Sequence, residues 1–313
     1  MVDQRTHRRA WPLWVPATVW LTGCNTVVMQ PAGDVAVQQA QLIAVSTWLM
    51  LLIIVPVIAL TLLFAWRYRD SNRQAPYTPD WDHSTGLELV IWGAPLLIII
   101  ALGLLTWIST HTLDPYRPLQ RLDSTRALPA ELPALEVEVV AMDWKWLFIY
   151  PQEGVATVNE LAAPVDRPIH LRITATRMMN SFFVPALAGQ VYAMGGMQSQ
   201  LHAVINQAGS YEGFSANYSG AGFSDMRFQF LGLSPTDFEA WLAHNRAVGG
   251  TLDRARYRAL ERPSVREPVL RFAQVEPGLF RTILARCVEP SPHCLRTPAA
   301  RHSPSPASRH AQP

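Results

Sequence analysis

The chain has 313 residues, and its formal net charge of +2 is too small to indicate a nucleic-acid partner. Hydrophobic residues make up 49% of it, which allows one or two folded domains together with membrane segments. The three cysteines, Cys24, Cys287 and Cys294, lie outside the expected domain core, so they indicate neither a disulfide framework nor a structural zinc site.

Residues 1–23 have the pattern of an export signal. Three arginines near the N-terminus precede a short apolar stretch, Trp11 to Leu21, that is too short to span a bilayer. This stretch ends in Leu-Thr-Gly-Cys24, which matches the bacterial lipobox. We therefore expect Cys24 to be acylated and to become the first residue of the mature chain, with residues 24–41 as a periplasmic N-terminal segment.

Two uncharged stretches, Leu42–Trp66 and Leu89–Thr110, predict membrane-spanning helices. At ~1.5 Å per residue each is long enough for the ~30 Å hydrocarbon core. Tryptophans lie near both ends of each stretch, as expected for an aromatic belt. Residues 42–110 are thus predicted to form two transmembrane helices joined by a loop over 67–88.

The predicted lipid anchor sets the orientation of this hairpin. Arginines flank the second helix on both sides, so the positive-inside rule alone decides little. A lipidated cysteine faces the outside, which makes the loop 67–88 cytoplasmic. Everything after about residue 111 is then expected in the periplasm, next to the inner membrane.

The periplasmic part begins with a proline-rich linker over residues 111–134 and continues with short β-like runs over 135–233. These runs alternate apolar and polar residues or are rich in aromatic residues, and glycines and prolines separate them. Such a pattern predicts a β-sandwich. The runs cover residues 135–140, 144–150, 169–175, 200–205 and 226–231.

Residues 234–288 are predicted to be a helical region. Ser234 is a suitable N-cap, followed by Pro235 and by an acid at the third helical position. A second short helix is expected over 277–286. The tail 289–313 is rich in Pro, Ser, Arg and His, and we expect it to be disordered. Cys287 and Cys294, with His293 beside them, leave open a disulfide, a metal site or no role.

The stretch after residue 214 carries the most specific motif. Ser215, Ser219, Phe223 and Met226 follow the spacing S-x3-S-x3-F-x2-M. This spacing resembles C-x3-C-x3-H-x2-M, the dinuclear copper loop of subunit II of the haem-copper oxidases. In that family a histidine in an upstream H-S-F segment completes the site, and here Asn180 occupies its position.

The ligand types of that copper centre are missing. Two copper ions need soft thiolates and imidazoles. A serine hydroxyl does not ionise near neutral pH, a phenylalanine cannot coordinate, and the lone thioether of Met226 is a weak ligand. We interpret the motif as a copper-binding scaffold that holds no copper. The same loss of ligands resembles subunit II of the bo-type ubiquinol oxidases, over about residues 24–286.

This resemblance implies a fold and a function. The fold is a two-helix transmembrane hairpin, then a periplasmic cupredoxin-like β-sandwich and short C-terminal helices. The function is that of subunit II of a proton-pumping ubiquinol oxidase, which braces subunit I and contacts the other oxidase subunits and membrane lipid. Haems, the catalytic copper and the quinol site are expected on subunit I, with no cofactor in this chain and no cytochrome c partner.

The resemblance also places Glu88 at the mouth of a proton pathway into subunit I. Glu88 lies at the cytoplasmic edge of the second helix, where an ionisable group can take up protons. The alternative is a solvated carboxylate that the helix dipole favours. No other residue of the chain is a candidate for catalysis.

Three further positions have structural interpretations. The segment Asp143–Trp146 resembles the tryptophan motif of oxidase subunit II, and without a copper acceptor we expect packing and contact with subunit I. Asn217 occupies the position of a glutamate that bridges toward magnesium in the family, but an amide lacks the charge, so no magnesium is expected. His202 lies on an alternating strand and is interpreted as structural.

Two other functions remain open at this point. A cytochrome c oxidase subunit II is one, since acidic residues outnumber basic ones over 127–249 and a basic cytochrome c docks on an acidic face. A membrane lipoprotein with a structural sandwich and no respiratory role is the other. Ubiquinol and menaquinol fit the sequence equally, because neither would bind this chain. The sequence also does not indicate the haem types of the partner subunit.

Overall fold

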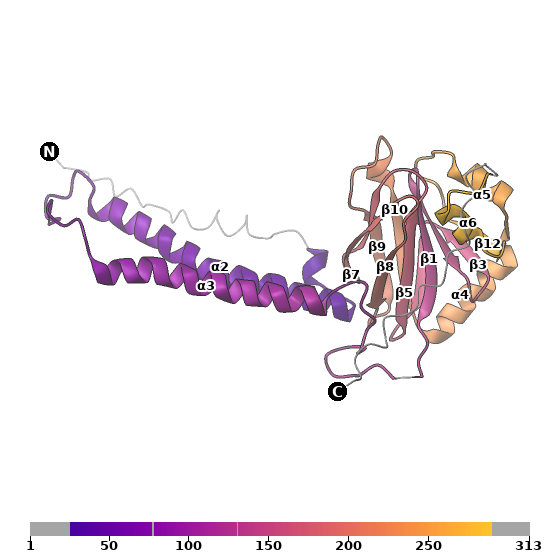
Figure 1. The fold of residues 1–313 in the computed structure, drawn as a ribbon, viewed down its shortest axis with the longest axis horizontal. Coiled ribbons are helices and arrows are strands. Elements are labelled where there is room, and N and C mark those ends of the chain that lie inside the picture. Colours follow the sequence, from indigo (N-terminus) through magenta and orange to yellow (C-terminus); the bar gives the residue numbers. More distant parts are fainter. Residues whose placement is uncertain (1–25, 77, 130, 290–313) are drawn as a thin grey trace, which may run out of the picture.

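The computed structural model describes residues 26–76, 78–129 and 131–289. The predicted signal peptide, Cys24 and residues 290–313 lie outside these ranges. Figure 1 shows two parts, a pair of long helices and a β-sandwich. The start of the first helix and the end of the second connect to the sandwich. The predicted order of helical hairpin, β-sandwich and short C-terminal helices is confirmed.

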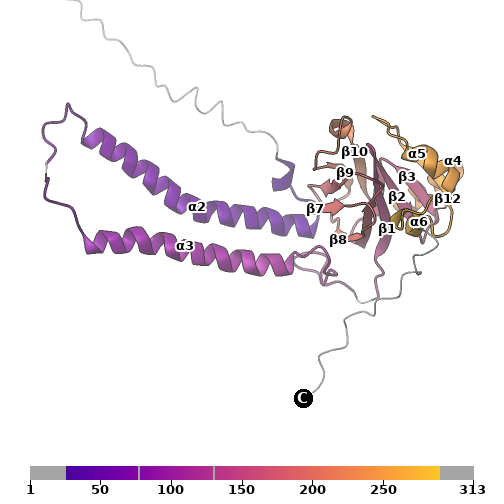
Figure 2. The same cartoon turned by 45° about the horizontal axis from the view of Figure 1, so that its top comes forward.

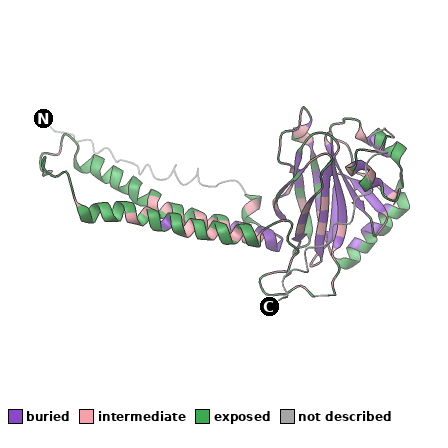
Figure 3. Ribbon diagram, viewed as in Figure 1, coloured by how far each residue is buried: buried purple, intermediate pink, exposed green. Residues whose placement is uncertain are grey.

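The hairpin consists of α2 (Asp34–Arg67) and α3 (Thr85–Thr112). Both are long and apolar enough to cross a membrane, and they run side by side in two views (Figures 1 and 2). Most of their side chains are exposed, in contrast to the strands (Figure 3). Such apolar surface is stable only against lipid or other membrane helices.

The helix α2 begins eight residues before the predicted apolar stretch. Its first turns carry polar residues, and they pack against the sandwich instead of entering the membrane. Residues buried there are Asp34, Val35, Ala36 and Ala40. A short 3-10 helix η1 (Val27–Met29) precedes them.

Gly33 lies at the closest approach between this segment and the sandwich. The backbone N–H groups of Ala32 and Gly33 donate to the carbonyl of Ala186, at 2.9 and 3.1 Å. A Cβ atom on Gly33 would lie 2.3 Å from the carbonyl oxygen of Val204. Glycine is therefore the residue that allows α2 to start directly on the sandwich surface.

Two mixed sheets form the sandwich in the part of the chain that the structure describes. The seven-stranded sheet has the order β11 (Gly250–Leu252), β12 (Leu270–Val275), β3 (Val155–Val158), β2 (Lys145–Tyr150), β1 (Leu135–Met142), β5 (Pro168–Ala175) and β8 (Ser199–Val204). The five-stranded sheet has the order β4 (Glu160–Pro164), β10 (Arg227–Leu233), β9 (Gly209–Ser215), β6 (Asn180–Val184) and β7 (Ala188–Ala193).

Aromatic side chains fill the space between the sheets. Trp146 and Phe148 of the seven-stranded sheet pack on Phe182 and Phe228 of the five-stranded sheet, with ring centroids 5.0 to 6.5 Å apart. All four are buried, and each such side chain stabilises the fold by roughly 1.5–3 kcal/mol. These rings are the centre of the main core.

A second core lies on the outer face of the seven-stranded sheet. Helices α5 (Arg254–Glu261) and α6 (Leu279–Leu284) cover it, and Tyr257 and Phe280 belong to the same buried cluster as Leu147 and Ile149 of β2. Strand β2 is thus buried on both faces. This explains why its residues Trp146–Tyr150 form a continuous apolar run without alternation.

Residues 234–288 differ from the purely helical region expected from the sequence. They contain α4 (Pro235–Val248), α5 and α6, but also β11 and β12. Strand β12 pairs antiparallel with β3 and so extends the large sheet beyond residue 233. Only Phe272 in this strand is buried, which explains why the sequence signal for it is weak.

The linker 111–134 lies against the sandwich and is held there by charged groups. Arg126 donates to both carboxylate oxygens of Asp166 at 2.8 Å, and the side chain of Asn206 donates to Asp166 at 2.8 Å. The hydrogen bonds from Arg126 hold the pKa of Asp166 below its ordinary value.

This lowered pKa predicts a pH dependence. The stabilisation by ionised Asp166 is complete above the pKa of an unfolded aspartate, about 3.9, and is lost as the pH falls through the lower folded pKa. Because Arg126 is 48% exposed, solvent screens the pair and its contribution to stability is modest. We expect Arg126→Gln to lower the Tm of the detergent-solubilised chain at pH 7, measured by tryptophan fluorescence, and to reduce its decline between pH 5 and 3.

Arg227→Gln is the matched control, since Arg227 pairs with a glutamate that is 59% exposed. It should leave the pH profile of Tm unchanged. Parallel profiles for wild type and Arg126→Gln would contradict a role of the two carboxylates that Arg126 contacts, Asp166 and Asp123.

Candidate functional site

The degenerate copper motif lies where β9, β6 and β10 meet. Strand β9 ends at Ser215, and β10 begins directly after Met226, with the 3-10 helix η2 (Phe223–Asp225) in the loop between them. Strand β6 begins at Asn180 and pairs antiparallel with β9. The pairing brings the upstream position of the motif to the loop, as its resemblance to a metal site requires.

Asn180 and Ser215 are in direct contact. The Ser215 hydroxyl donates to Oδ1 of Asn180 at 3.0 Å, and both side chains are buried. The amide of Asn180 donates in turn to the carbonyl of Met178 at 3.1 Å. Hydrogen bonds between neutral groups thus join the two strands where the family places a histidine and a cysteine.

The other motif positions are occupied by packing side chains. Met226 is fully buried and belongs to the main core. Phe223 is half-buried and packs edge-to-face on Tyr218, with centroids 5.7 Å apart. Ser219 is buried, and its hydroxyl has no hydrogen-bond partner among the described residues.

These residues do not fit a dinuclear copper centre. The donor set consists of two hydroxyls, one amide and one thioether, and it offers neither a thiolate nor an imidazole. Across residues 26–76, 78–129 and 131–289, His, Cys, Asp and Glu side chains nowhere gather in threes in a geometry suited to a metal ion. We derive no redox step through this loop.

Trp144, from the tryptophan segment, packs directly on the loop. Its indole N–H donates to the carbonyl of Ser219 at 3.1 Å. A Cβ atom on Gly222 would lie 2.5 Å from the Trp144 ring, so glycine is needed there for the ring to lie flat on the loop. Trp144 thereby fixes the loop, in agreement with the packing role expected for it.

The neighbouring Lys145 ties the same segment to the C-terminal region. Its ammonium is buried, donates to the carbonyl of Arg262 at 2.9 Å and contacts the hydroxyl of Ser264. The Glu267 carboxylate lies 3.9 Å away. Burial lowers the pKa of Lys145, and this carboxylate opposes the effect.

Asn217 and His202 have structural contacts. The Asn217 amide donates to the carbonyls of Met179 and Tyr218, both at 3.3 Å. His202 stacks on His170 with ring centroids 4.2 Å apart, and Glu136 lies 2.8 Å from His170. Burial, followed by the neighbouring His170, lowers the pKa of His202 to about 4, so it is neutral at physiological pH.

Glu88 lies in the first turn of α3, after the N-cap Ser84. Its side chain is 51% exposed and lies 2.8 Å from Nδ1 of His83. The carboxylate is therefore accessible from the loop side of the hairpin. Both interpretations of Glu88, a proton-uptake group and a solvated helix-start carboxylate, are compatible with this position.

The cysteines are only partly placed. Cys287 is disulfide-bonded. Cys294, His293 and the predicted lipidation site Cys24 lie outside the described residues.

Sequence reasoning missed a polar cavity at the junction of the helices and the sandwich. Asp34, Arg117 and Arg121 line it together with His202. The available signal was the group of charged residues directly after the second apolar stretch, which we used only for topology.

Two family models match the chain. "Cytochrome C oxidase subunit II, periplasmic domain" matches residues 136–230, and "COX Aromatic Rich Motif" matches residues 246–291. The first agrees with the cupredoxin-like sandwich expected from the motif. The second covers β11 and β12, which are strands of the large sheet, and α5 and α6, which pack on its outer face.

Curated relatives match over most of the chain. "Cytochrome bo(3) ubiquinol oxidase subunit 2" of Pseudomonas putida is 47% identical, over 84% of this chain and 81% of the relative. "Ubiquinol oxidase subunit 2" of Acetobacter aceti is 50% identical, over 85% and 84%. Among solved structures, the periplasmic domain of subunit II of cytochrome oxidase of Bradyrhizobium japonicum matches with a TM-score of 0.35 and 18% identity, over 36% of this chain and 95% of that one.

The geometry of the loop predicts that copper binding is absent and can be restored. The wild-type chain, incubated with excess copper and desalted, should retain less than one equivalent. Exchange of Ser215 and Ser219 to Cys, and of Asn180 and Phe223 to His, should give tight, stoichiometric copper. The strands β6 and β9 already hold Asn180 and Ser215 in contact, and the loop keeps the spacing of the motif for the other two positions. Metal analysis and electronic absorption measure both.

Phe183→His and Phe214→His in place of the two histidine exchanges are a matched control, since these positions lie on the same strand pair outside the motif. Stoichiometric copper in the wild-type chain would contradict our interpretation of the loop.

Proposed function

Because the chain belongs to the family of ubiquinol oxidase subunit 2, we propose that it is subunit II of a proton-pumping ubiquinol oxidase in the aerobic respiratory chain. In this role it braces subunit I, which oxidises the quinol and reduces oxygen to water. Haems and the catalytic copper belong to subunit I. This chain contributes to the oxidoreductase as a subunit without a redox centre of its own.

The donor set of the loop from Ser215 to Met226 is the observation that supports this proposal most directly. A water-soluble electron donor needs a redox relay at the periplasmic face to reach a buried haem. Two hydroxyls and a phenylalanine cannot build that relay. A quinol reaches subunit I through the membrane, so its oxidation requires no relay in this chain.

Cytochrome c oxidase subunit II is the alternative function, and the matching family model carries that name. The acidic balance of residues 127–249 would also suit a basic cytochrome c. Yet binding without an electron acceptor transfers no electrons. We therefore reject the alternative, because the loop lacks the ligands of an electron acceptor even if a basic protein docks on the domain.

The hairpin supports a bracing role. Apolar side chains along α2 and α3 are exposed over the membrane-spanning part. We propose that subunit I and other oxidase subunits cover part of this surface and lipid covers the rest. The close contact at Gly33 and the ion pair between Arg121 and Asp34 would hold the sandwich over that assembly.

The two apolar helices and the match to a periplasmic domain are consistent with a location in the bacterial inner membrane, with the sandwich in the periplasm. We further propose that Cys24 carries the lipid anchor at the mature N-terminus. Intact mass of the assembled subunit should show acylation at Cys24 without residues 1–23, and a retained signal sequence would overturn this.

The electron donor is the first prediction of this proposal. The purified complex should consume oxygen with a short-chain ubiquinol and not with reduced cytochrome c. The assay is run at low ionic strength, where docking of a basic protein on an acidic face is strongest. Sustained oxygen uptake with reduced cytochrome c, without added quinol or other oxidases, would overturn the proposal.

Glu88 provides the second prediction, on the proposal that it delivers protons to subunit I. Glu88→Gln removes the titratable group but keeps nearly the same shape, so assembly should be unchanged while turnover falls. Asp82→Asn, which removes an exposed charge in the loop before α3, should leave turnover unchanged. The measurement is quinol oxidation per assembled complex across the pH range, and a wild-type profile for Glu88→Gln would exclude the role.

A further inference from the structure

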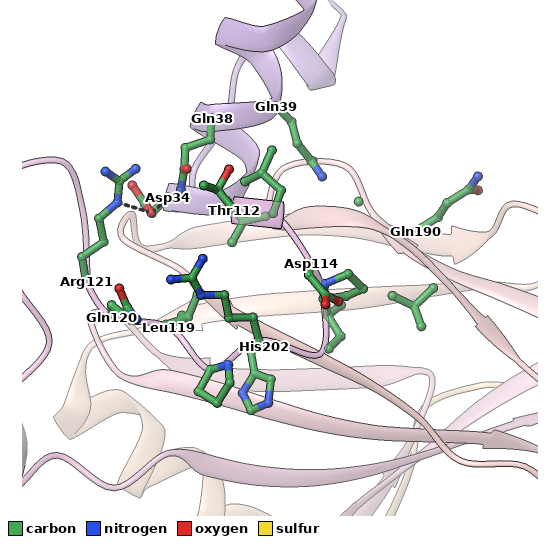
Figure 4. Close-up of a pocket in the computed structure, with 18 residues that line it drawn as sticks. Asp34, Gln38, Gln39, Thr112, Asp114, Leu119, Gln120, Arg121, Gln190 and His202 are labelled. Carbon is green, nitrogen blue, oxygen red and sulfur yellow. Dashed lines mark hydrogen bonds and ion pairs between the residues drawn. The ribbon is translucent and has the colours of Figure 1, made fainter. Parts of the chain in front are cut away.

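A polar cavity of about 360 Å³ lies between the hairpin and the sandwich (Figure 4). The start of α2 covers it on one side, the segment after α3 on another, and strands β7 and β8 on a third. Figure 4 shows Gln38 and Gln39 projecting from the helix, and Asp114 and His202 beneath them. The charged residues that line the cavity are Asp34, Asp114, Arg117 and Arg121, with Gln38 and His202 beside them.

The cavity lies at the level of the lipid headgroups. The uncharged stretch of α2 begins at Leu42, and Gln38 is four residues before it, about 6 Å along the helix. The headgroup layer extends roughly 5–7 Å beyond the hydrocarbon core on each side.

Two of the charges that line the cavity, those of Asp34 and Arg121, neutralise each other. Asp34 is 3% exposed, accepts from Nε of Arg121 at 2.9 Å and accepts from the Gln38 side chain at 2.8 Å. This pair fastens the segment after α3 to the start of α2. It leaves no net charge for a ligand.

The other two charges of the cavity are not paired. Within the described ranges, Arg117 has no carboxylate partner, and its guanidinium makes a single long hydrogen bond, to the carbonyl of His111 at 3.3 Å. Asp114 forms no ion pair with any described residue and accepts only from the backbone N–H of Tyr116, at 3.0 Å. His202 adds no charge, since it is neutral near pH 7.

We propose that this cavity binds the headgroup of an outer-leaflet phospholipid, with its phosphate on Arg117 and a primary ammonium group at Asp114. A guanidinium presents parallel N–H donors that match two phosphate oxygens. A headgroup with one negative and one positive charge complements the one unpaired cation and the one unpaired anion. The acyl chains would descend along the exposed apolar surface of the hairpin.

The site would therefore join a lipid to the contact between sandwich and hairpin. Both charged groups, Arg117 and Asp114, lie on the segment after α3, while α2 and the sandwich edge form the other walls of the cavity. A bound headgroup should thus stabilise the position of the periplasmic domain over the membrane. This inference requires only that the hairpin spans the membrane, so it is independent of the electron donor of the complex.

The test uses the assembled complex, purified in mild detergent and washed until weakly held lipid is removed. Native mass spectrometry follows the binding of added dioleoylphosphatidylethanolamine to wild type, Arg117→Gln and Arg258→Gln. Arg258 lies exposed on α5 outside the cavity, so its exchange is the same charge change at a remote place. We expect the lipid concentration that fills the tightest site to rise about tenfold for Arg117→Gln and to stay unchanged for Arg258→Gln.

Two further measurements test the ligand chemistry. Asp114→Asn should abolish the preference for dioleoylphosphatidylethanolamine over dioleoylphosphatidylcholine, whose quaternary ammonium has no N–H donor. Inorganic phosphate at millimolar concentration should not displace the lipid, because it has no acyl chains to lie along the hairpin.

Equal binding by all three forms would overturn the proposal, and displacement by inorganic phosphate would overturn the assignment to a lipid. Arg117→Lys covers the case in which Arg117→Gln does not assemble. It keeps the charge but not the paired donors, so its affinity for the lipid should lie between those of the wild type and Arg117→Gln. An affinity equal to that of the wild type would contradict the role of the guanidinium.

Discussion

The hydrogen bond from Ser215 to Asn180 occupies the place of the metal–ligand bonds that would join the loop to the upstream strand. A single neutral hydrogen bond contributes only about 1 kcal/mol, so it cannot order a loop of this length alone. The indole of Trp144 and the buried side chain of Met226 add packing from both sides of the loop. The shape of the loop thus rests on hydrogen bonds and packing, and a metal is no longer needed to hold it.

A second constraint acts where the sandwich meets the membrane. Gly33 lets α2 start on the sandwich itself, and Asp34 pairs with Arg121 on the segment that follows α3. Both ends of the hairpin are therefore tied to the same side of the domain. A domain held in this way can brace a membrane subunit, which needs a fixed position and not an electron-transfer surface.

Much of the fold was predictable because its signals are local. The two membrane helices follow from long uncharged runs, and the helix after Ser234 from its cap. The strand around Val155 was missed because it has only four residues, and the strand around Ala188 because only half of its residues are buried. The helix at Tyr257 lies in the region predicted to be helical, but its bounds had no clear signal because only Tyr257 and Leu260 in it are buried. The contact between Asn180 and Ser215 was implied by a resemblance, whereas the cavity at Arg117 depends on tertiary placement that no spacing in the sequence reveals.

The central claim is that electrons bypass this chain, so that its former copper loop has only a structural role. Met226→Leu keeps the volume of the buried side chain but removes its sulfur, and it should cost less than about 1.5 kcal/mol. The most direct measurement is quinol oxidation per assembled complex that carries Met226→Leu together with Ser215→Ala. The account predicts wild-type turnover, with any loss confined to the yield of complex. A marked fall in turnover of intact, fully assembled complex would contradict it.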